Sequence, residues 1–217
     1  MNHPLDGARL KIARAEEHLR ALEHEIQVYL DTQPYELIKK WQNGQRAASI
    51  RVRVSPPSHL SAVVGDCLYN LRSSLELTFW ALALQTGPKD PDRDRVSFPI
   101  FASESKFRAA EDGFARYIHP EALEIVEQVQ PFRTRSIALS VVRTLSNQDK
   151  HGFLSLTLTS VASARPPSAF VALDNPAVPA GGVDALLRKI LQHIGADVLP
   201  KFDPLFSPAA AGRRRDP

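Results

Sequence analysis

Cysteine is nearly absent from this chain, which carries only Cys67 among its 217 residues. A single thiol excludes a disulfide framework and any zinc site that needs several thiolates. No apolar run approaches the roughly 18–20 residues that a membrane-spanning helix requires, so we expect no membrane partner. The chain also begins with a charged helical pattern, where a signal peptide would carry an apolar stretch. These absences predict a cytoplasmic protein.

Motifs of the common enzyme classes are absent as well. The sequence has no Gly-x-Ser-x-Gly element, no phosphate-binding glycine loop and no dinucleotide-binding glycine pattern. Its seven histidines are scattered, and His18 and His24 do not lie on one face of a helix. We therefore expect neither a metal site nor a cofactor.

Charge is nearly balanced over the whole chain, with 27 Lys and Arg against 24 Asp and Glu. A net charge of +3 is too small to indicate nucleic-acid binding by itself. The distribution is more informative, because residues 36–54 contain five cations and only one acid, Glu36. The net charge of this segment therefore exceeds that of the entire chain.

Hydrophobic residues recur at helical spacing over most of the chain. From residue 5 to residue 30 they follow alternating steps of three and four. This pattern fits a bundle helix with one buried stripe or, alternatively, a dimeric coiled coil, which would make the protein a homodimer. We expect one helical-bundle domain over residues 1–206 and a disordered basic tail at 207–217. Its core helices are expected at 5–30, 58–86, 136–151 and 183–194, with shorter helices at 103–117 and 119–130.

Two pairs of strands are expected beside the helices. An Asn-Gly dipeptide at 43–44 is typical of a tight turn, and alternating residues on either side predict a β-hairpin at about 35–54. A second strand pair is expected at about 153–173. In the hairpin, Arg51 and Arg53 alternate with apolar residues, so one face packs while the other presents cations. That cationic face is either an RNA-binding surface or a solvated one.

Polar residues interrupt the apolar surface of the second long helix. Asp66 and Asn70 share a flank with apolar residues, and a buried polar group without a partner costs about 1–3 kcal/mol. We therefore expect both residues to join a polar network with the segment 147–151. Arg72 and Glu76 lie one turn apart on the polar side, a spacing at which opposite charges pair.

The helix predicted at 136–151 carries polar residues near its end. Arg143, Asn147 and Lys150 cluster on its polar face, and His151 follows Asn147 by one turn. Asp149 lies on the core face in the last turn, where a carboxylate opposes the helix dipole unless another contact compensates it. Lys150 and His151 also have a purely structural explanation, because cations stabilise a helix C-terminus.

The two polar helices resemble those of a large set of bacterial proteins of unknown function. The first helix carries Asp66 and then Asn70-Leu-Arg72-Ser, and the second carries Asn147 and then Asp149-Lys-His. The resemblance covers residues 60–155 or so. That set in turn resembles the HEPN superfamily, all-helical domains many of which are metal-independent endoribonucleases of toxin and defence systems. The resemblance implies a HEPN-like helical domain. Together with the helix and strand patterns above, we expect a mainly α fold: a four- to five-helix, HEPN-like bundle with a β-hairpin insertion and a small C-terminal strand pair.

HEPN ribonucleases carry an arginine and, after four to six intervening residues, a histidine near a helix end, usually paired across a homodimer. The nearest match here is Arg143 with His151, which has seven intervening residues and rotates the two side chains by about 80°. In such a site His151 would be the general acid and base. Arg143 and Lys150 would stabilise charge on the phosphate, and Asn147 would orient groups.

Two functional hypotheses follow, beside the plainer interpretation that these polar residues lock two core helices together. The preferred function is a non-catalytic module that binds a nucleotide, RNA or a partner protein. The alternative is a metal-independent endoribonuclease that uses Arg143, Asn147 and His151. The residues expected to bind the ligand are Asp66, Asn70, Arg72, Asp149, Lys150, Arg51 and Arg53.

Overall fold

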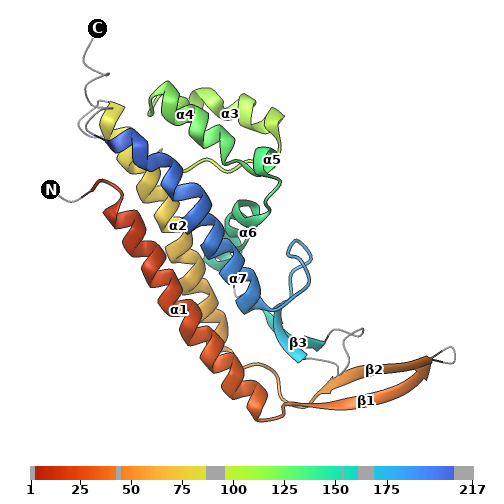
Figure 1. Ribbon diagram of the computed structural model, residues 1–217. Helices are drawn as coiled ribbons and strands as arrows, with labels where there is room; N and C mark the ends of the chain where they lie inside the picture. The colour runs from red at the N-terminus through yellow and green to blue at the C-terminus, as the bar shows by residue number, and fades with distance from the viewer. Residues whose placement is uncertain (1–2, 43–44, 87–95, 153, 161–168, 208–217) are drawn as a thin grey trace, which may run out of the picture.

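The computed structural model describes residues 3–42, 45–86, 96–152, 154–160 and 169–207 (Figure 1). Within these ranges the side chains of 39–42, 45–48 and 150–151 are not described. The predicted Asn-Gly turn at 43–44 and nearly all of the predicted basic tail at 207–217 therefore lie outside the described residues.

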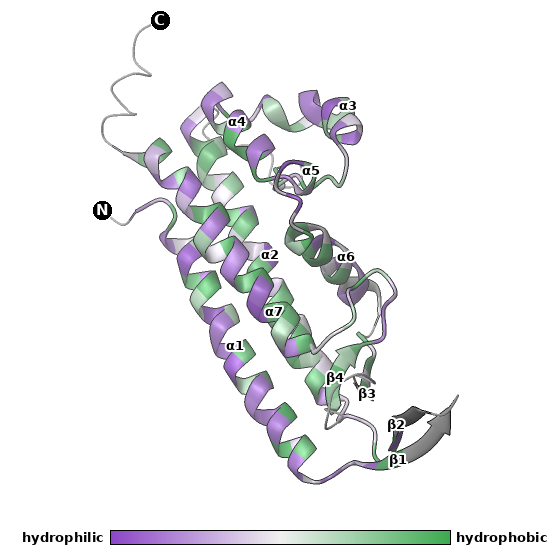
Figure 2. Cartoon of the chain, turned by 45° about the vertical axis from the view of Figure 1, so that its right-hand side comes forward, coloured by the Kyte–Doolittle hydropathy of each residue, from purple (hydrophilic) through white to green (hydrophobic). Residues whose placement is uncertain are grey.

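Two long antiparallel helices form the frame of the molecule. They are α1 (Asp6–Asp31) and α2 (His59–Thr86), which lie side by side in Figure 1. Hydrophilic and hydrophobic residues alternate along α1 in Figure 2, as the periodicity of an amphipathic helix requires. The predicted stripe of α1 is buried within the single chain, so it does not provide a surface for the expected homodimer. Its buried members are Ala8, Ala15, Leu19, Leu22, Ile26 and Tyr29.

Two further helices complete the bundle, as predicted. They are α6 (Ala138–His151) and α7 (Val183–Gln192). The sequence predicted an end near residue 194, but the chain continues through a π-helical turn, η1 (His193–Val198), and a 3-10 helix, η2 (Leu199–Phe206). Proline is tolerated in the first turn of a helix, which is where Pro200 stands. Burial of Phe202 and Leu205 accounts for the ordered continuation.

Three shorter helices close one end of the bundle. They are α3 (Glu104–Ala115), α4 (Pro120–Gln128) and the single turn α5 (Pro131–Thr134), which was not predicted. Phenylalanine rings from this region pack on one another, with Phe107 at the centre of the group. Among the described helices, none combines the length and the apolar character needed to cross a bilayer.

Two antiparallel strand pairs complete the fold, which confirms the predicted mainly α class with two small strand pairs. Strands β1 (Tyr35–Gln42) and β2 (Gln45–Val52) pair as a hairpin that projects from the end of the bundle (Figure 1). Strands β3 (Leu156–Ser160) and β4 (Ala169–Leu173) form the second pair.

A buried glutamine fixes the segment that follows the second long helix. Gln130 is fully buried, and its Oε1 accepts a hydrogen bond of 2.9 Å from the backbone N–H of Phe101. Its Nε2 donates to the carbonyl oxygens of Pro99 and Val126, both at 2.9 Å. Because each of these polar groups gains a partner, the extended segment 97–101 is held against α4.

Candidate ligand-binding site

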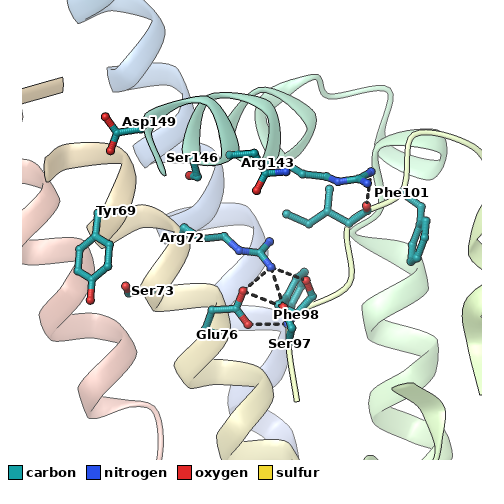
Figure 3. Close-up of a pocket in the computed structure, with 12 residues that line it drawn as sticks. Tyr69, Arg72, Ser73, Glu76, Ser97, Phe98, Phe101, Arg143, Ser146 and Asp149 are labelled. Atoms are coloured by element: carbon teal, nitrogen blue, oxygen red, sulfur yellow. Dashed lines mark hydrogen bonds and ion pairs between the residues drawn. The ribbon is translucent and has the colours of Figure 1, made fainter. Parts of the chain in front are cut away.

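A cavity of about 440 Å³ lies between α2, the segment 97–101 and α6 (Figure 3). The second long helix supplies Tyr69, Arg72, Ser73 and Glu76 to its wall. The facing helix supplies Arg143, Ser146, Asn147 and Asp149. The cavity therefore collects side chains from both of the polar helices that the sequence singled out.

Arg72 anchors the floor of this cavity. Its Nη2 donates to Ser97 Oγ and to the carbonyl oxygen of Phe98, each at 3.0 Å, and it forms an ion pair with Glu76. Glu76 Oε2 accepts a hydrogen bond of 2.7 Å from the N–H of Phe98. The predicted pairing of Arg72 with Glu76 is confirmed, and together the two side chains satisfy both polar groups of the Phe98 backbone.

One nitrogen of the Arg72 guanidinium does not take part in these contacts. Nη1 is buried and has no hydrogen-bond partner among the described residues. Burial lowers the pKa of Arg72 and the nearby Arg143 guanidinium lowers it further, while Glu76 acts in the opposite direction. A guanidinium nevertheless keeps its charge in proteins, so Nη1 is a buried, charged donor that lacks an acceptor.

Arg143 and Ser146 lie on the opposite wall of the cavity. Arg143 is exposed, and its Nη1 donates to the carbonyl oxygen of Ile100 at 3.1 Å. Ser146 is only 7% exposed, and its hydroxyl has no partner among the residues that the structure describes. This end of the cavity thus holds two guanidinium groups, one of them ion-paired with Glu76, and an unpaired hydroxyl, which are donors that an anionic ligand can use.

The other end of the cavity is acidic. A second cavity of about 490 Å³ adjoins it, and Tyr69 and Asp149 line both. Asp66 lines the second cavity together with Gly65. The Asp149 carboxylate lies so close to Gly65 that a Cβ there would be 2.7 Å from its Oδ1. Desolvation raises the pKa of Asp149, and the negative charge of Asp66 raises it further.

This raised pKa predicts that Asp149 destabilises the fold at neutral pH. The folded protein favours the protonated form of this carboxyl. The contribution of Asp149 to the free energy of unfolding is therefore greatest below the ordinary aspartate pKa of 3.8, and it falls as the pH rises through the raised pKa. We expect Asp149→Asn to melt at a higher temperature than the wild type at pH 7, with a smaller difference at pH 3.5. Thermal unfolding at both pH values, with the exposed Asp112→Asn as control, measures this. A difference that does not change with pH would contradict it.

The expected polar network is only partly present. Asp66 does share a cavity with Asp149, but it is exposed and not buried as expected. Asn70 is buried, yet its hydrogen bonds run to the carbonyl oxygen of Asp66 at 2.8 Å and to Lys11 Nζ at 3.3 Å. The amide therefore connects α2 to α1, because the neighbouring helix presents a cation at that level.

The remaining predicted site residues do not all lie at the main cavity. Asn147 lines the main cavity beside Arg143, whereas the side chains of Lys150 and His151 lie outside the described part of the chain. Arg51 and Arg53 lie on the projecting hairpin and pair with Glu36 at 2.6 and 2.7 Å, which lowers the pKa of that carboxyl. The hairpin arginines do not line the cavity.

Several cavity residues were not predicted. Ser97 and Phe98 come from a loop that packs on α2, and no local sequence pattern predicts this packing. For Ser146, the sequence offers only its position one turn after Arg143 as an indication that it lines the cavity. Over the described residues, no group of three or more His, Cys, Asp or Glu side chains is arranged to hold a metal ion.

Comparisons with protein-family models, with curated proteins and with solved structures find no match for this chain. The assignment of a function therefore depends on the geometry and chemistry of the cavity.

Proposed function

We propose that this protein is a non-catalytic binding module that recognises a phosphate-bearing nucleotide in the cavity between α2 and α6. The observation that carries this proposal is the buried Nη1 of Arg72, a charged donor without a partner among the described residues. An unsatisfied buried donor costs free energy that a bound acceptor would recover. A phosphate oxygen is the acceptor that best matches a guanidinium in charge and geometry.

The surroundings of Arg72 support a ligand larger than a free phosphate ion. Arg143 and the unpaired Ser146 hydroxyl provide further donors for phosphate oxygens. Tyr69 and Phe101 line the same cavity, and aromatic rings are the usual stacking partners of nucleic-acid bases. A volume of about 440 Å³ lies within the usual range of small-ligand sites. A mononucleotide or the end of an RNA chain combines both chemical features.

The test is calorimetric titration of the purified protein with nucleoside monophosphates and with inorganic phosphate. Arg143→Gln is expected to weaken nucleotide binding by about 10- to 100-fold, the effect of losing one charge-assisted hydrogen bond. Arg116→Gln is the matched control, because Arg116 is also exposed and also donates to a backbone carbonyl, that of Gly113 at 3.3 Å. Equal affinity of the two variants, or no binding by the wild type, would contradict the proposal.

A metal-independent endoribonuclease is the second candidate. The observation in its favour is that Arg143 and Asn147 of α6 line one cavity, and Asn147 lies one turn before His151 at the end of that helix. Incubation of labelled RNA with the protein in excess chelator tests it, beside His151→Ala. Cleavage that this substitution abolishes would replace the binding proposal with catalysis. Intact RNA together with measurable nucleotide affinity is the result that we expect.

A further inference from the structure

We infer that the cavity selects guanine nucleotides, with the base held at the acidic end by Asp66 and Asp149. The inference depends on the proposed function, since it assigns the base of a nucleotide whose phosphate binds Arg72 and Arg143. It rests on the polarity of the site, whose two adjoining cavities share Tyr69 and Asp149 as lining residues; the two cavities together are called the trough below.

Charge is separated along this trough. The order of charges is reversed on the two helices that line it, so Arg72 lies near Arg143 at one end and Asp66 lies near Asp149 at the other. Figure 3 shows the same order, with Asp149 and Tyr69 on one side and Arg143 on the other. The basic and the acidic member of each helix are six positions apart, which corresponds to about 9 Å at 1.5 Å per residue.

A nucleotide has matching polarity. Its phosphate is anionic, and the far edge of a guanine base carries two adjacent N–H donors, N1–H and the N2 amino group. A carboxylate accepts two such donors side by side in the way it accepts a guanidinium. Adenine has an acceptor beside its amino group, as has cytosine, and uracil has one N–H between two carbonyl oxygens. None of them offers that pair of donors. The acidic end therefore favours guanine over the other three bases.

Two further features of the trough belong to a ligand site. The Ser146 hydroxyl is more than nine-tenths buried and unpaired among the described residues, and it lines the cavity near Asp149. Tyr69 is 60% exposed and lines both cavities, with Lys11 Nζ 5.2 Å from the centre of its ring, and such an exposed aromatic side chain can stack on a base. The Asp149 carboxylate, which is partly desolvated and repelled by the Asp66 charge, also gains from N–H donors of a ligand.

The decisive measurement is titration of the full chain with GMP, AMP, CMP and UMP. We expect GMP to bind about tenfold or more tightly than the others, the discrimination that a bidentate base contact gives. Equal binding of all four would overturn the inference but leave the proposed function intact. Failure of all four to bind would overturn the proposed function as well.

Gly65→Ala tests the acidic end without removing a charge. The new methyl group would lie 2.7 Å from Asp149 Oδ1, so the carboxylate must move away. Gly113→Ala is the matched control, because both glycines lie within helices and a Cβ at Gly113 meets nothing within 4 Å. We expect Gly65→Ala to lose the preference for GMP while AMP affinity and the circular dichroism spectrum stay as in the control. A preserved GMP preference in Gly65→Ala would overturn the inference.

Discussion

Replacing Gln130 with alanine is expected to lower the free energy of unfolding by about 3–5 kcal/mol, because it removes a fully buried side chain with three hydrogen bonds. The N–H of Phe101 and the carbonyl oxygen of Pro99 would both lose their partner. A cavity would also open between α4 and the segment 97–101. Chemical denaturation of the wild type and the variant measures the difference.

The matched control for this prediction is Gln128→Ala. Gln128 lies two residues earlier in α4 and is exposed, so its loss should change stability by no more than about 0.5 kcal/mol. Because the segment 97–101 lines the ligand cavity, Gln130→Ala should also weaken nucleotide binding. A loss of stability no larger than that of the control would show that Gln130 does not hold the segment in place.

Replacing Glu76 with alanine is expected to cost about 2–3 kcal/mol, somewhat less than the loss of one partner of a fully buried ion pair. Glu76 is about one third exposed and Arg72 about one fifth exposed, at 32% and 19% of their side-chain surface. The substitution leaves the Arg72 charge without its counterion and the Phe98 N–H without its acceptor. Denaturant titration at neutral pH measures the cost.

A double-mutant cycle separates the pair from the packing of either side chain. Removing both charges, as in Arg72→Met with Glu76→Leu, should cost less than the two single substitutions added together, because no unpaired charge remains. The exposed pair of Arg14 and Glu17, at 2.5 Å on α1, provides a control cycle that should give less than about 1 kcal/mol of coupling. Additive single effects at Arg72 and Glu76 would contradict the structural role given to the pair.

Sequence periodicity was sufficient to predict the long helices but not the end of the fold. The stripe of α1 repeats over more than six turns, so its helix could be placed within one residue at each end. Beyond residue 194 no helix was predicted, whereas the chain stays helical to Phe206 and buries Phe202. Tertiary packing there outweighs local propensity.

The candidate site was predictable only where its partners are close in sequence. Arg72 and Glu76 are four residues apart on one helix, so their pairing followed from helical geometry. The partner of Asn70 proved to be Lys11, 59 positions away, which no spacing rule identifies. The polar face of the helix predicted at 136–151 indicated Arg143 and Asn147, but the unpaired donors at Arg72 and Ser146 became visible only in three dimensions.

A crystal structure of the protein grown with GMP tests the central claim most directly. We expect the phosphate between Arg72 Nη1 and Arg143, with a phosphate oxygen at about 3 Å from Nη1, and the base beside Asp66 and Asp149. Phosphate at the arginines with the base turned away from the carboxylates would support only the binding function. GMP bound elsewhere on the molecule, or an empty cavity at saturating GMP, would contradict the account.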